Sequence, residues 1–236
     1  MTGQNFLNVV CGSSTVEGLL RYDPNDAKAR VTVLGWLNLV LKDLANRQQN
    51  FHWRFLEKQA TFNTAASDFD YALATIAVDI DTTKFVNVYD KTDDNTYIYK
   101  PYEEFRKLIA DETISTGSRF WYSIFAGNLL LWPLPAGIVS TSIDYVRVFT
   151  DATDAATAID VPSKYDPVLV DGVLVYAQMF DPKRVNPAIN FQSKYEDGVR
   201  RMIQDNSMII DDMPRLGSHR SRQPMEPGLD RTSGVY

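Results

Sequence analysis

Apolar and polar residues alternate from Ser118 to Phe149, and this pattern predicts a β-meander that the flanking helices cover on one face. Residues 120–125 alternate between two faces with the period of a strand and form its first arm. Ala126-Gly127-Asn128 then supplies the positive-φ positions of a tight hairpin turn. The return arm ends at Pro133, which cannot donate a ladder hydrogen bond, and residues 143–149 alternate again as a third arm.

The most regular helical pattern runs from Ala27 to about Asn50 and carries two adjacent apolar stripes. The first stripe consists of Leu34, Leu37, Leu41 and Leu44, and the second of Val33, Trp36 and Val40. A helix that is apolar around most of its circumference is buried on two sides. The pattern favours a central core helix. The alternative is that Val33, Trp36 and Val40 form an interface with a neighbouring subunit.

Shorter patterns predict the elements between this helix and the meander, and the loop after it. Residues 51–62 begin with alternating aromatic side chains and are predicted as a strand. Residues 85–89 and 96–99 flank an Asx-type turn and predict a hairpin. We expect a short helix from Tyr102 to Ala110, and the small polar residues 150–160 predict a loop.

Two antiparallel helices are predicted near the end of the chain. Their start signals, an N-cap followed by proline, are Asp166-Pro167 and Asn186-Pro187. Their apolar stripes are Leu169, Val173, Ala177 and Phe180, and then Phe191, Tyr195, Val199 and Met202. The predicted fold class is therefore α+β, a helical bundle packed against an antiparallel β-sheet or meander, with an extended C-terminal tail.

We expect three regions along the chain: a lead-in over residues 1–22, an α+β body over residues 23–210, and a tail over residues 211–236. In the lead-in, Ser14 and Glu17 have the spacing of a capping box and predict a helical turn. From Met213 onward, prolines, glycines and arginines leave too few apolar residues for a core, so this segment is either a disordered end or folds on a partner. Because it holds four arginines against Glu226 and Asp230, its charge is +2, and the total of −6 leaves −8 for the rest.

The composition narrows the class of protein. A chain of 236 residues with 44% hydrophobic and 12% aromatic residues is typical of a globular protein. The net charge of −6 argues against a protein that wraps DNA through phosphate contacts, but not against one that DNA merely passes. Cys11 is the only cysteine, which fits a reducing compartment. No apolar run reaches the roughly 20 residues of a membrane span, so we expect a soluble protein without a membrane partner.

Residues that carry chemistry are few. The sequence contains no GxSxG, Walker lysine loop, HExxH or CxxC motif. A dyad of Cys11 with His52 or His219 stays open, although His52 between aromatic residues is better explained as structural than as a metal ligand. The acidic run over residues 90–94 lacks the glycine and the final glutamate of an EF-hand, which favours a solvated turn. We therefore expect neither catalysis nor a cofactor.

Several short motifs recur in a characteristic order: Leu37-Asn38 with Leu41, Phe51-His52-Trp53-Arg54-Phe55-Leu56, Asp70-Tyr71-Ala72-Leu73, Tyr102-Glu103-Glu104-Phe105, Gly117-Ser118-Arg119-Phe120-Trp121-Tyr122, Leu129-Leu130-Leu131-Trp132-Pro133-Leu134-Pro135, Tyr145, and Val161-Pro162-Ser163-Lys164-Tyr165 with the helix from Val168. In this order and spacing they resemble the head-to-tail adaptor proteins of tailed bacteriophages, over roughly residues 26–205. The chain departs from the family pattern at Ala74, where the family has proline.

The resemblance implies a structural virion protein made in the host cytoplasm. It implies a homo-oligomeric ring, usually dodecameric, between the portal protein and a downstream tail or nozzle protein, with genomic DNA passing through the channel without specific binding. A C-terminal extension reaches the portal in such proteins, so the portal-binding candidates are Arg215, Leu216, Arg220, Arg222, Leu229, Arg231 and Tyr236. Two alternatives remain: a virion-associated cell-wall hydrolase, and a head-completion or tail-terminator protein of different fold.

Overall fold

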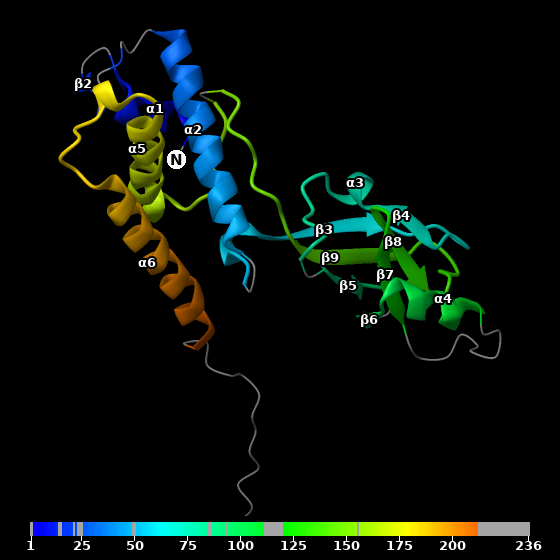
Figure 1. The fold of residues 1–236 in the computed structure, drawn as a ribbon. Helices are drawn as coiled ribbons and strands as arrows, with labels where there is room; N and C mark the ends of the chain where they lie inside the picture. The colour runs from blue at the N-terminus through cyan, green and yellow to red at the C-terminus, as the bar shows by residue number, and fades with distance from the viewer. Residues whose placement is uncertain are drawn as a thin grey trace, which may run out of the picture.

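A computed structural model of the chain describes residues 2–13, 16–20, 22, 26–48, 51–84, 86–92, 94–110, 120–154 and 156–211. The described residues form two parts that lie side by side, a helical bundle and a curled β-sheet (Figure 1). The chain enters the sheet after α2 (Ala27–Asn46) and returns to the bundle after β9 (Ser140–Val146). The predicted α+β class is confirmed.

The bundle is built around α2, which packs against α1 (Gly3–Val10) and α5 (Asp166–Phe180), while α5 also packs against α6 (Phe191–Asp211). The helix α2 begins at Asp26, whose carboxylate accepts the backbone N–H of Lys28 at 2.9 Å. Both predicted stripes of α2 are buried in one core, together with the predicted stripe of α6.

The helix starts differ in part from the predictions. The helix α6 begins at Phe191, because the side chain of Asn190 accepts the N–H of Ser193 at 3.0 Å and Asn186 instead forms a local turn with Ala188. Phe180 was predicted to face inward with the rest of its stripe, and this is wrong: it is 62% exposed. The reason is that α5 ends at Phe180 and the chain turns away there through η3 (Pro182–Arg184).

The lead-in contains a helix, but not where the capping box placed it. The helix α1 precedes that motif, whose Glu17 lies in β2 (Val16–Glu17), paired with β1 (Gly12–Ser13), while Ser14 lies outside the described residues. Phe6, Leu7 and Val10 are buried in the core of the bundle. Their burial fixes the helix at residues 3–10, because these three side chains share one helical face.

The sheet has seven strands in the order β3-β9-β5-β6-β7-β8-β4. Besides β9, its strands are β3 (Glu57–Asn63), β4 (Asp70–Ala72), β5 (Val86–Asp90), β6 (Asn95–Tyr99), β7 (Trp121–Phe125) and β8 (Asn128–Trp132). All neighbouring pairs are antiparallel except β6 and β7, which are parallel. The sheet is therefore mixed, whereas an antiparallel one was expected.

The predicted hairpins are confirmed. The third arm of the meander also forms a strand, but at another place in the sheet than predicted. The β5–β6 and β7–β8 hairpins form as expected, and Ala126 and Gly127 adopt φ angles of 51° and 81° in the second turn. The strand β9, however, pairs with β3 and β5 rather than with β8. Pro133 ends β8, so the chain is free to cross the sheet. Ile143 and Tyr145 of β9 are then buried beside Val86 and Val88 of β5.

The aromatic stretch after α2 is not a strand either. Residues 54–56 form the short helix η1 (Arg54–Leu56), and β3 begins only at Glu57. Trp53 is completely buried and its Nε1–H donates to the carbonyl of Leu44 at 3.0 Å. Asn206 of α6 bonds the backbone of both His52 and Arg54 at 2.9 Å. These tertiary contacts override the alternating pattern.

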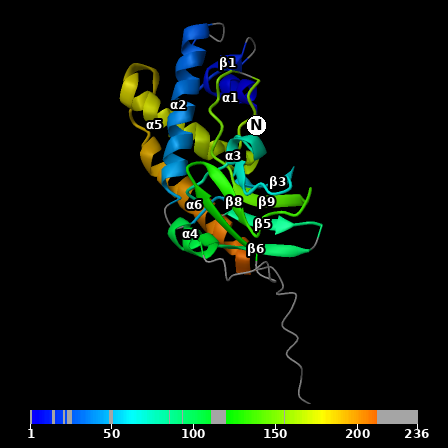
Figure 2. The same ribbon diagram turned by 90° about the vertical axis from the view of Figure 1, so that its right-hand side faces the viewer.

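Curling brings the two edges of the sheet together, so that the core lies inside the curl (Figure 2). Phe62 of β3 contacts Tyr71 of β4 with ring centroids 5.2 Å apart, and α3 (Leu73–Ile76) packs on β3. On the outer face, α4 (Tyr102–Ala110) has the predicted bounds and buries Phe105 against Trp121. The flanking helices were expected to cover one face of the sheet. The helical bundle instead lies beside the sheet (Figure 1).

Close helix packing at Gly172 generates a stability prediction. A Cβ at Gly172 would lie 2.9 Å from both Tyr195 and Val40, whereas a Cβ at Gly35 would meet nothing within 4 Å. We expect Gly172→Ala to lower the free energy of unfolding by about 1–3 kcal/mol through overpacking. The matched control Gly35→Ala should raise it by up to about 1 kcal/mol through helix propensity. Urea titrations followed by circular dichroism measure both, and a stabilised Gly172→Ala would contradict the packing.

Candidate docking surfaces

A polar clamp ties α2 to α6 beside the core. Arg47 donates to both carboxylate oxygens of Glu196, at 2.8 and 2.7 Å, and to Asp43 at 2.8 Å. The hydroxyl of Tyr195 donates to Asp43 at 2.7 Å. The hydrogen bonds from Arg47 hold the pKa of Glu196 below its ordinary value, and burial raises the pKa of Tyr195. Both carboxylates of the clamp accept hydrogen bonds from within the protomer, so the clamp orients the helices rather than binding a partner.

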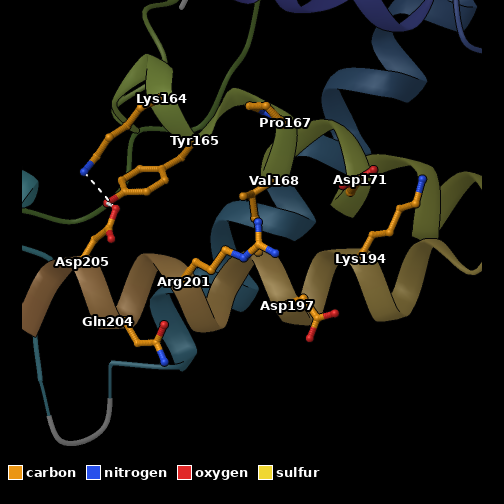
Figure 3. Close-up of a pocket in the computed structure, with 11 residues that line it drawn as sticks. Lys164, Tyr165, Pro167, Val168, Asp171, Lys194, Asp197, Arg201, Gln204 and Asp205 are labelled. Atoms are coloured by element: carbon orange, nitrogen blue, oxygen red, sulfur yellow. Dashed lines mark hydrogen bonds and ion pairs between the residues drawn. The ribbon is translucent and has the colours of Figure 1, made fainter.

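A charged groove of about 630 Å³ runs between α5 and α6 (Figure 3). At one end Asp205 accepts from Lys164 at 3.2 Å and from Tyr165 at 3.1 Å, and these bonds lower the pKa of Asp205. The other charged lining residues are Asp171, Lys194, Asp197 and Arg201. With three cations and three carboxylates, the groove presents a balanced strip that suits a charged protein surface.

An aromatic groove of about 590 Å³ lies on the outer face of the sheet, between α4 and the edge formed by β8 and β4. Phe105 and Leu130 are buried in its floor, with 1% and 7% of their surface exposed. Its rim is formed by Phe69 and Phe125, which are 42% and 48% exposed. The ring of Phe125 stacks on Tyr102 with centroids 3.7 Å apart. The groove is therefore built to receive an apolar group.

The structure places the predicted interface residues of α2 inside the protomer. Val33 and Val40 have no exposed surface and Trp36 is 7% exposed. They belong to the core of the bundle, which is the role that the pattern favoured. A contact with another subunit stays a prediction for these residues, and it would require the helices to separate.

The predicted portal-binding residues all lie outside the described part of the chain, which ends at Asp211. Their role stays a prediction. They are Arg215, Leu216, Arg220, Arg222, Leu229, Arg231 and Tyr236.

The residues considered above as candidates for catalysis or metal binding are buried or contact other residues of the protomer. Cys11 is buried, and burial raises the pKa of its thiol to about 11, so it is protonated at neutral pH. His52 lies 2.8 Å from Glu57 through its Nε2 atom. Asp90 is buried and accepts the N–H of Thr92 at 2.7 Å, so the prediction of a solvated turn is wrong for Asp90. Within the described ranges, no cluster of three or more His, Cys, Asp and Glu is placed to hold a metal.

The aromatic groove was not found from the sequence. Its lining comes from segments around Phe69, Phe105 and Phe125, and no local spacing links them. The one available signal was Phe125, which directly precedes the turn of a hairpin and therefore lies at its tip. Among the described helices, none has the length and hydropathy of a membrane-crossing segment.

The described residues therefore form an α+β protomer with two surface grooves, one charged and one aromatic. The family model described as SU10 adaptor protein matches residues 14–221, and the chain belongs to this family of phage head–tail adaptors. It is therefore a structural component of a bacteriophage that acts in tail assembly. No curated protein matches the chain.

The clamp generates a prediction for pH. Because Arg47 lowers the folded-state pKa of Glu196, this carboxylate stabilises the fold above its unfolded pKa, and the contribution is lost as the pH falls below about 5. We expect Glu196→Gln to cost about 1 kcal/mol at pH 7, a value discounted for partial exposure, and to flatten the loss of stability toward pH 3. Urea unfolding at pH 7 and pH 3.5 measures both effects.

The matched control for this experiment is Asp197→Asn. Asp197 pairs with Arg200 at 3.1 Å, and both side chains are more than half exposed. We expect its stability change to stay within about 0.5 kcal/mol at either pH. If Glu196→Gln and the wild type lost stability equally on acidification, the clamp would have no role in the pH dependence.

Proposed function

We propose that the chain forms a homo-oligomeric ring, dodecameric as the resemblance implies, between the portal protein and a downstream tail or nozzle protein. Its channel would let genomic DNA pass without specific binding. The observation that carries this proposal is the adaptor family match over residues 14–221. The ring sits at the head–tail interface of the virion in this proposal.

The position where the tail leaves the body supports portal docking. The helix α6 extends away from α1 and η3 and ends at Asp211, at the end of the bundle opposite to them (Figure 1). The residues that follow are rich in arginine, which pairs with carboxylates through two parallel hydrogen bonds. A segment that starts at the end of the body can reach a partner without disturbing the core. Because a ring would carry many copies of this segment, weak individual contacts with the portal would add up to a high overall avidity.

The charge of the protein supports a passive channel. The chain carries a net charge of −6, and the residues before Met213 carry more negative charge than the whole. The cations of the charged groove are matched by Asp171, Asp197 and Asp205, so this surface offers no continuous positive track for phosphates. DNA sliding past such a surface would release few counterions and would not be retained.

Deleting residues 213–236 tests portal docking. We expect binding to purified portal rings to fall at least tenfold, because the arginine contacts are lost, while the thermal midpoint of the body stays unchanged. Co-sedimentation with portals and differential scanning fluorimetry measure the two quantities. A shorter deletion, residues 222–236, removes only the segment beyond the family match and locates the docking residues.

The outcomes separate the alternatives. Full-strength docking by the 213–236 deletion would assign portal binding to the body and overturn the role of the tail. Electron microscopy of the wild-type protein mixed with portals should show rings at the portal, and their absence would overturn the proposed function. Clearing of peptidoglycan suspensions by the purified protein would support the hydrolase instead.

A further inference from the structure

Met179 and Phe180, here called the α5 knob, form an exposed apolar projection at the end of α5. They are 67% and 62% exposed. Isolated exposed apolar residues are common, but two large neighbours at one helix end form a patch. The ring of Tyr176 lies parallel to that of Phe180, with centroids 6.5 Å apart and an interplanar angle of 7°. Phe180 therefore projects from an ordered support.

The chain around the α5 knob is held in place by contacts with the lead-in. Tyr22 donates its hydroxyl hydrogen to Asp181 at 3.0 Å, and the guanidinium of Arg184 lies 4.5 Å from the Tyr22 ring centroid. Arg184 also pairs with Asp181 at 3.4 Å. A fixed base lowers the entropy cost of inserting the knob into a partner.

The aromatic groove is complementary to the α5 knob in size and in apolar character. Its volume of about 590 Å³ lies within the range of roughly 300–1,000 Å³ in which proteins hold ligand groups. The stacking of Phe125 on Tyr102 and the buried floor keep the groove open in one shape. An inserted phenylalanine would meet aromatic rings on its rim, where ring contacts add to burial.

The charges beside the two features are opposite in sign. Lys183 and Arg184 follow the α5 knob and are exposed, and because Arg184 pairs with Asp181, this segment keeps a net charge of +1. Asp70 lines the aromatic groove, and Asp68 lies next to its Phe69 rim, and both carboxylates are exposed. The one cation of the lining, Arg106, lies over the Tyr102 ring at 6.0 Å from its centroid. Complementary charges steer an encounter and fix its register.

The two features cannot meet within one protomer. The end of α5 lies at the top of the bundle, whereas α4 lies on the side of the sheet that is far from the bundle (Figure 1). A contact between two different patches is heterologous, and repeated around an axis it closes into a ring. Resting on the proposed ring function, we propose that the α5 knob of one protomer inserts into the aromatic groove of the next copy of the chain.

Two variants that each disable one side test this contact. Phe180→Asp removes the knob and adds an acidic group that meets Asp70, and Phe69→Lys blocks the rim with a charge that repels Lys183. Both positions are exposed, so folding should be preserved, and circular dichroism checks it. We expect each variant alone to stay monomeric by mass photometry, with and without portal rings, at a tenfold higher concentration than the wild type needs to assemble.

Mixing the two variants gives the decisive result. One retains its groove and the other its knob, so a single productive contact remains and we expect heterodimers but no rings. The matched controls are Val78→Asp and Ile138→Asp, which change exposed apolar residues outside both features, 90% and 79% exposed, and should assemble like the wild type.

The outcomes distinguish this contact from the ring itself. If the wild type forms rings and both variants do as well, or if the mixture yields no heterodimer, the knob-and-groove contact is overturned and the ring function stands. If the wild type forms no ring even on portals, both fail together.

Discussion

The close approach of three helices at Gly172 is the constraint on which the rest of the bundle depends. Because Gly172 has no Cβ, Val40 of α2 and the Tyr195 ring of α6 come within contact of α5 at one point. That approach brings the Tyr195 hydroxyl to Asp43, and Arg47 then joins Asp43 to Glu196. Packing and polar contacts therefore support each other, and neither geometry survives a shift of one helix alone.

A rigid bundle gives the protomer surfaces in fixed relative positions. The end of α5 projects from it on one side. The chain leaves the bundle for the sheet at Leu56 and returns after Val146, and both residues belong to the core of the bundle. The curled sheet closes its own edges through Phe62 and Tyr71, which leaves little free edge for uncontrolled strand pairing. An adaptor must avoid aggregation before it assembles, and the closure of the sheet protects its edges until then.

The elements with strong local signals were predicted well. The helix α4 has the predicted bounds, both hairpins form at their predicted turns, and the stripes of α2 and α6 are buried as expected. The failures have two causes: contacts between distant segments, and local helix ends that periodicity does not reveal. The stretch around Trp53 has the alternating pattern of a strand, but it packs under α2 instead. Phe180 has the spacing of a core residue, but α5 ends at this residue and leaves it exposed. The aromatic groove was invisible because its residues are separated in sequence.

The α+β class, the periodic elements and the membership in an adaptor family could be predicted from the sequence, because periodicity, turn residues and motif order are local or sequential properties. The three-dimensional fold was needed to learn the partner strands of β9, the burial of Val33, Trp36 and Val40 within one protomer, and the exposure of Phe180. Apolar periodicity shows that a face of a helix or strand must be buried, but not which other segment buries it. That choice depends on which distant segment reaches the face with a matching shape.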